Sequence, residues 1–216
     1  MAATTELFQL GSRAIVLLTA IPVHEAAHAL VAWRLGDPTA KDAGRLSLNP
    51  ARHFDLFGSV CLLAVGIGWA KPVPIDARRF RHPRAGMALS AAAGPLSNFL
   101  MALLAMLAAK IVYYAGGGAG WAQTAANVLL AVCIINISLG IFNLLPLPPF
   151  DGSRIYSVFL PERFYFGIMR YERYILFAVL ALLWLGVLDR PLGFLNNAVF
   201  TGLDWLTTPV DLLAGR

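Results

Sequence analysis

Charged residues are scarce in this sequence: they make up 13% of it, against roughly 25% in soluble domains. Hydrophobic residues fill 58% of the 216 positions, and the mean hydropathy is +0.68. This composition excludes an ordinary soluble domain and predicts a protein of the membrane class.

Cysteine is also rare. The two cysteines, Cys61 and Cys133, each lie inside an apolar stretch. They are too few and too isolated for a disulfide framework or for a zinc site built from cysteines. We interpret both as buried thiols that pack in the interior.

The net charge of +5 does not indicate nucleic-acid binding, because the basic residues lie between hydrophobic segments, where membrane topology explains them. A cleaved signal peptide over residues 1–20 is not favoured either. That stretch lacks an early basic cluster and a small-residue cleavage site, and its apolar run continues beyond it.

Long apolar runs dominate what is present. A spanning helix needs roughly 20 apolar residues. No internal repeat divides the chain, so we expect one integral membrane domain over residues 1–216, with a core at about 8–155 and C-terminal membrane segments at about 172–210. The runs predict helices over about 8–35, 86–114, 121–145 and 172–188, and a weaker apolar segment over 191–203.

Between the first two predicted helices lies a mixed region, 37–85. Inside it, the apolar run from Leu56 to Ala70 is only about 15 residues long and is punctuated by glycine. It is short for a span and fits a re-entrant or interfacial segment. An ordinary short helix is the alternative for residues 54–75.

The loops predict the orientation. The segment Gly116–Gly120 carries no charge, whereas regions 37–85 and 152–173 are rich in arginine. The positive-inside rule places both basic regions in the cytoplasm. We therefore expect a multi-pass protein of the cell (inner) membrane.

The first helix carries the pattern HExxH, as His24-Glu25-Ala26-Ala27-His28. Positions i and i+4 share a helix face, so both imidazoles can point at one metal ion, with Glu25 beside them. The alternative is two histidines packed in a helix. It is weak because a purposeless glutamate facing lipid costs at least about 2.5–3.5 kcal/mol.

A catalytic zinc site usually takes a third protein ligand. Asp151 follows a long uncharged run and three prolines that break the helix, so it can line a buried cavity. It can equally be an aspartate in water at an interfacial helix stop. The other candidates lie in basic loops or among arginines: His53, His82, Glu162 and Glu172.

Several segments together decide between the two interpretations of Asp151, as a residue of a buried site or as an aspartate in water. HExxH in the first helix and the late Asn143–Gly152 segment resemble the site-2 protease family of intramembrane metalloproteases, and most closely its compact bacterial members. The resemblance covers about residues 20–155. Further matching segments are Gly44-Arg45-Leu46-Ser47-Leu48-Asn49-Pro50, Gly68-Trp69-Ala70-Lys71-Pro72-Val73-Pro74 and Gly94-Pro95-Leu96-Ser97-Asn98.

The resemblance implies the site residues. By similarity, one zinc ion per chain is bound by His24, His28 and Asp151, and Glu25 is the general base. Asn98 and Asn143 are substrate-binding candidates, although an amide hydrogen bond between helices also explains Asn98. His53 is a candidate gate or regulatory residue, or an ordinary residue of the interface.

The resemblance also implies fold and function. It predicts an all-α integral membrane protein with a three-helix catalytic core, flanking helices, and a re-entrant loop or β-hairpin between the first two core helices. The expected activity is endopeptidase cleavage within or near transmembrane segments of substrate proteins, at a site open toward the cytoplasm. The alternative is a catalytically inactive zinc-binding or scaffold protein of the membrane.

The family also bears on control of the activity. Larger relatives carry PDZ or CBS regulatory domains, for which this sequence leaves no room. We therefore expect the activity to be controlled by a preliminary cleavage of the substrate or by a regulatory membrane partner.

Overall fold

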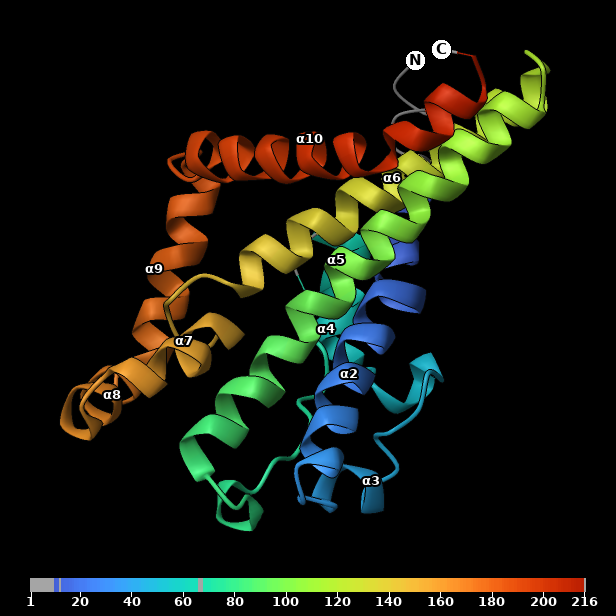
Figure 1. The fold of residues 1–216 in the computed structure, drawn as a ribbon. Coiled ribbons are helices and arrows are strands. Elements are labelled where there is room, and N and C mark those ends of the chain that lie inside the picture. The colour runs from blue at the N-terminus through green and yellow to red at the C-terminus, as the bar shows by residue number, and fades with distance from the viewer. Residues whose placement is uncertain (1–9, 12, 66–67, 216) are drawn as a thin grey trace.

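The computed structural model describes residues 10–11, 13–65 and 68–215, and over these it is all-helical, without a named strand. Within the described part of the chain, three helices are long and apolar enough to cross a membrane: Arg13–Arg34, Pro83–Ala115 and Gly120–Asn143 (Figure 1). The all-α class and the three long core helices are thus confirmed. The predicted start at residue 8 lies outside the described residues.

The first of these helices contains a π-helical turn, η1 (Val16–Ala20), which leads into α2 (Ile21–Arg34). Gly36 follows the end of α2, and its φ of 107° suits glycine. Asp37 follows and is fully buried. Its carboxylate accepts hydrogen bonds from the backbone N–H of Thr39 (3.0 Å) and of Asp76 (2.7 Å), which ties the end of α2 to the segment before α5.

The apolar stretch between the first two core helices forms a helix, α4 (Leu56–Val65), where a β-hairpin was one expectation. The described residues around it show one isolated antiparallel bridge, between Phe54 and Ala70. A helix satisfies its backbone groups internally, whereas a lone hairpin leaves two edges without partners in apolar surroundings. The expected β-hairpin is therefore replaced by the alternative, a short helix. Re-entry of this segment into the membrane stays a prediction.

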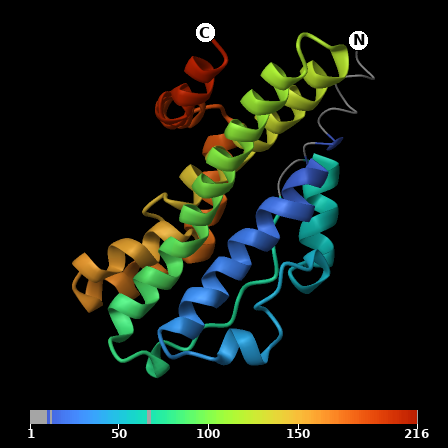
Figure 2. The same ribbon diagram turned by 45° about the vertical axis from the view of Figure 1, so that its right-hand side comes forward.

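The core of the molecule is the antiparallel pair α5 (Pro83–Ala115) and α6 (Gly120–Asn143), joined by a glycine turn (Figure 2). Small residues let the two helices approach closely. At Gly140 an added Cβ would lie 2.8 Å from the ring of Phe99, so that ring packs directly on the α6 backbone. The buried cluster consists of Ala102, Ala105, Met106, Cys133, Ile137, Ile141 and Leu203.

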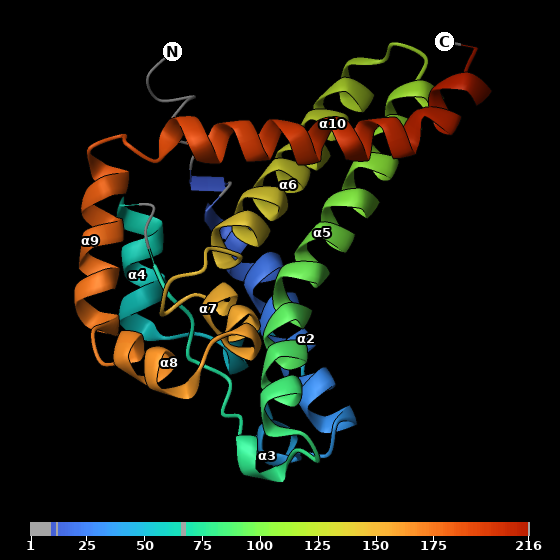
Figure 3. The same cartoon turned by 60° about the vertical axis from the view of Figure 1, so that its left-hand side comes forward.

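Four helices follow the core pair: α7 (Asp151–Tyr156), α8 (Glu162–Met169), α9 (Glu172–Trp184) and α10 (Asp189–Leu213). The chain bends by 84° between α9 and α10, and α10 then crosses α6 and α5 (Figure 3). The last helix is longer than the predicted apolar segment 191–203. The remaining short helices are α3 (Thr39–Asp42), η2 (Pro50–Arg52), η3 (Ala77–Arg79) and η4 (Ser157–Phe159).

A polar cluster fastens α10 to α5. The ammonium group of Lys110 lies 2.8 Å from a carboxylate oxygen of Asp204 and 2.5 Å from one of Asp211. The hydroxyl of Tyr114 donates a second hydrogen bond to Asp211 at 2.7 Å. In an otherwise apolar contact these charges fix the position at which α10 crosses.

Replacing Lys110 by methionine should loosen α10, because both aspartates then face the helix contact without a cation. We expect limited proteolysis of the detergent-solubilised protein to cut the α9–α10 region several-fold faster. The control is Arg190→Met, since Arg190 is exposed on α10 and makes no ion pair among the described residues. Equal cleavage of Lys110→Met and wild type would contradict the role of the cluster.

Candidate metal centre

His24 and His28 lie one helical turn apart on α2 and project toward the same point. Their Nε2 atoms are 3.0 Å apart and their rings meet edge to face. Each of these residues is 6% exposed. The i, i+4 spacing therefore brings the two imidazoles together as the sequence predicts.

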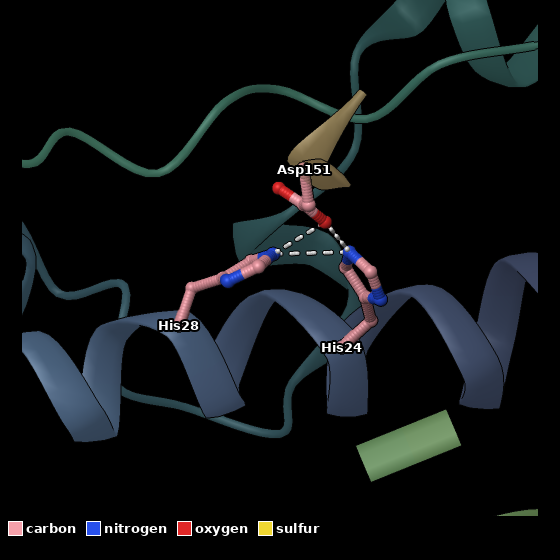
Figure 4. Close-up of side chains that lie close together, drawn as sticks. All are labelled: His24, His28 and Asp151. Atoms are coloured by element: carbon pink, nitrogen blue, oxygen red, sulfur yellow. Dashed lines mark hydrogen bonds and ion pairs between the residues drawn. The ribbon is translucent and has the colours of Figure 1, made fainter. Parts of the chain in front are cut away.

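Asp151 completes the cluster from a helix that is far from α2 in the sequence. It is the first residue of α7, directly after the proline-rich turn that ends α6. One carboxylate oxygen, Oδ2, lies 3.1 Å from His24 Nε2 and 3.3 Å from His28 Nε2 (Figure 4). The structure thus favours the buried alternative for this residue over an aspartate in water.

Gly152 makes this approach possible. A Cβ at this position would lie 2.3 Å from the carbonyl oxygen of Leu145 and 2.4 Å from that of Leu144. Only glycine fits so close to the backbone, so α7 can fold back tightly enough to present Asp151 to α2.

The three atoms form a donor set that suits a metal ion. Two ligands about 2.0–2.1 Å from a tetrahedral zinc ion lie about 3.3 Å apart, close to the observed separations. Asp151 Oδ2 is buried and has no hydrogen-bond partner, although both Nε2 atoms are near. These three potential ligand atoms all lie within 4.8 Å of one another, so a cation between them would satisfy all three.

The surroundings keep the carboxylate charged. Burial opposes ionisation of Asp151, but its interactions with the two imidazoles outweigh this effect and lower the pKa of its carboxyl below the ordinary value. Asp151 is therefore ionised at neutral pH, the state in which a carboxylate binds a metal ion.

Helix α5 contacts the Nδ1 atoms of both imidazoles. His28 Nδ1 lies 2.7 Å from the backbone carbonyl oxygen of Ser90, which can only accept a hydrogen bond. Nδ1 must therefore carry the proton, and Nε2 keeps its lone pair toward Asp151. The side-chain amide of Asn98 lies 3.1 Å from His24 Nδ1.

Between these two contacts, Gly94 gives the imidazoles their space. A Cβ there would lie 2.5 Å from the ring of His28 and 2.6 Å from the ring of His24. The Gly94 segment of the sequence thus belongs to the wall of the centre.

The other predicted site residues contribute no atom to the cluster of His24, His28 and Asp151. Glu25 is half-buried on the next position of α2, and Asn143 donates a hydrogen bond to the carbonyl of Leu139 one turn back in α6. His53 is fully buried, with its Nε2 2.7 Å from the carbonyl oxygen of Ser47. The roles predicted for these three residues, and substrate binding by Asn98, stay predictions.

Sequence reasoning did not single out Arg45 or Ser90. Arg45 is 4% exposed and donates a hydrogen bond to the carbonyl of Lys71. Burial lowers the pKa of its guanidinium, while the negative charge of Glu25 partly offsets this effect. Ser90 lies four residues before Gly94 on the same face of α5, which is the signal that was available for it.

The chain matches the sequence profile of Peptidase family M50 over residues 108–186. It is 41% identical over 149 residues to "Putative zinc metalloprotease YwhC" of Bacillus subtilis, a match that covers 68% of each chain. It is 28% identical over 139 residues to "Putative zinc metalloprotease Rip2" of Mycobacterium tuberculosis, which covers 62% of this chain and 52% of that one. No solved structure matches it significantly.

The identity to YwhC over two thirds of both chains, together with the M50 profile match, shows the family. The chain belongs to peptidase family M50, the site-2 protease family. It spans about two thirds of the Bacillus relative and about half of the Rip2 relative.

Gly94→Ala should abolish tight metal binding, because the added methyl group would occupy the space of both imidazole rings. The measurement is metal per chain by elemental analysis of the purified protein. Gly140→Ala is the matched control, since it crowds the ring of Phe99 in the same helix pair and touches neither histidine. Wild-type metal content in Gly94→Ala would contradict the role of this glycine.

Proposed function

We propose that the chain is a zinc-dependent endopeptidase that hydrolyses peptide bonds within or near transmembrane segments of substrate proteins. The observation that carries this proposal is the buried convergence of His24, His28 and Asp151, with Glu25 on the adjacent position of α2. Membership of the M50 family and the zinc metalloprotease names of its relatives support the same activity.

His24, His28 and Asp151 would hold the zinc ion as a two-histidine, one-carboxylate set. When bound, such an ion polarises the scissile carbonyl and lowers the pKa of a water molecule to about 7. Glu25 accepts the proton of the attacking water and returns it to the leaving amine nitrogen. Asn143, at the end of α6 before the turn to Asp151, is the proposed donor to the developing oxyanion.

A substrate helix hides its peptide bonds in its own hydrogen bonds, so it must unwind locally before it is cut. The stretch from Trp69 to Ile75 is not helical and forms one isolated bridge, at Ala70, so it could pair with an unwound strand of substrate. Its Lys71 N–H already donates to the carbonyl of His53. Because Pro72 and Pro74 have no N–H, added pairing would use Val73 and Ile75.

The proposed location is the cell (inner) membrane, with the centre open toward the cytoplasm. His28 lies six residues before Arg34, about 9 Å along the helix axis, so the centre lies toward the end of α2 that leads into the arginine-rich region 37–85. Arg78 and Arg79 precede α5 at its corresponding end, whereas the turn at Gly116–Gly118 is uncharged. The positive-inside rule assigns the arginine-rich end to the cytoplasm.

The proposed partners are transmembrane substrate proteins and the surrounding bilayer. Three spans with many exposed apolar side chains fit a lipid environment. We retain a regulatory membrane partner, or a preliminary cleavage of the substrate, as the means of control within a single membrane domain of residues 1–216.

Glu25→Gln should reduce cleavage by a factor of about 10²–10⁴, because the amide cannot accept the proton of the attacking water. The assay measures cleavage of reconstituted single-span proteins by gel shift and mass spectrometry. Zinc content should stay at the wild-type value, since Glu25 is not one of the three converging ligands.

Glu172→Gln is the matched control, because Glu172 begins α9, outside the metal cluster. It should cleave as wild type does. Full activity in Glu25→Gln would exclude the proposed mechanism. If wild type binds zinc but cuts no membrane-spanning substrate in a broad panel, the alternative of an inactive zinc-binding scaffold would be the better explanation.

A further inference from the structure

Asn98 is buried inside the molecule, and its surroundings differ from those of a substrate-binding residue. It is fully buried on α5, one helical turn beyond Gly94. Its amide nitrogen lies 3.1 Å from His24 Nδ1, whereas its amide oxygen is buried without a hydrogen-bond partner. A buried acceptor without a partner is costly, so this contact calls for a physical explanation.

The tautomer of His24 determines whether its Nδ1 atom needs a hydrogen-bond donor or an acceptor from the Asn98 amide. His24 Nε2 is 3.1 Å from Asp151 Oδ2, in the converging cluster. To bind a metal ion there, Nε2 must offer its lone pair, so the proton must lie on Nδ1. An amide NH₂ facing an Nδ1–H group places two donors against each other.

A half-turn of the Asn98 amide removes both the contact between two donors and the buried oxygen without a partner. The two ends of the group have nearly the same shape, so the exchange needs little additional space. It places Oδ1 against the Nδ1–H of His24 and gives the orphaned oxygen a partner. One rotation thus satisfies the amide oxygen and frees Nε2 for the metal ion.

We propose that Asn98 is a positioning residue of the metal centre: its amide oxygen accepts the Nδ1–H hydrogen bond of His24 and thereby fixes the tautomer and orientation of that ligand. This inference rests on the proposed zinc-dependent function. It assigns Asn98 to metal binding in place of the substrate contact expected from the sequence.

Helix α5 also offers a hydrogen-bond acceptor to His28. Ser90 and Asn98 are eight residues apart on one face of α5, with Gly94 midway. Ser90 presents a backbone carbonyl to His28, and Asn98 presents a side-chain carbonyl to His24. Only the second acceptor can be removed by substitution, which makes Asn98 the position to test.

The test measures zinc affinity by chelator competition in the detergent-solubilised protein of residues 1–216. Asn98→Leu, which removes the acceptor at similar size, should weaken zinc binding by about 10–100-fold. Asn98→Asp, which keeps an acceptor and loses the donor, should bind zinc at least as tightly as wild type. Weaker binding by Asn98→Asp would show that the amide donates, and would overturn the proposal even if Asn98→Leu does not fold.

Asn136→Leu is the matched control. Asn136 is also fully buried, but its amide donates to the carbonyl of Val132 in its own helix, α6. It should bind zinc as wild type does. An equal loss in Asn136→Leu and Asn98→Leu would reduce the effect to general packing and overturn the proposal.

A kinetic comparison separates positioning from substrate binding. At saturating zinc, we expect Asn98→Leu to lower kcat and to leave KM near the wild-type value. A raised KM with unchanged zinc affinity would assign Asn98 to the substrate and contradict the proposal. If wild type itself binds no zinc, the proposed function fails together with this inference. If only the Asn98 effects are missing, the proposed function still stands.

Discussion

The structure depends on one constraint: three atoms that could bind a metal ion, from distant parts of the chain, meet in a buried position. His24 and His28 share a face of α2, but Asp151 lies more than 120 residues later in the sequence, at the start of α7. Polar atoms that converge away from water are costly unless they are bonded to one another or to a cation. Under the proposed function, a zinc ion would therefore contribute to the stability of the core as well as to its chemistry.

The convergence of these three side chains requires the helices around them to pack closely. Gly94 lets α5 touch both imidazoles, and Gly152 lets α7 fold back on the end of α6. A side chain at either position would push the ligands apart by more than a metal site tolerates. The contacts to Ser90 and Asn98 then orient the rings, so that α5 acts as the supporting wall of the centre.

Much of this was predictable from the sequence, since apolar runs fix the long helices and the HExxH spacing fixes one face of α2. Residues alone left Asp151 undecided, because its position depends on how a proline-rich turn folds back against a distant helix. The segment Leu56–Val65 was too short for its periodicity to separate helix from hairpin. The spacing from Gly94 could place Ser90 on the same face of α5, but the contact of its carbonyl with His28 was not predictable, because a backbone acceptor does not depend on the residue type.

The zinc content of purified wild-type protein and of Asp151→Ala tests the central claim most directly. We expect about one zinc per chain in wild type and a clear loss in Asp151→Ala, because two histidines alone do not complete the site. A folded wild-type preparation that takes up no zinc even when it is supplied would contradict this claim. So would an Asp151→Ala protein that retains zinc as tightly as wild type.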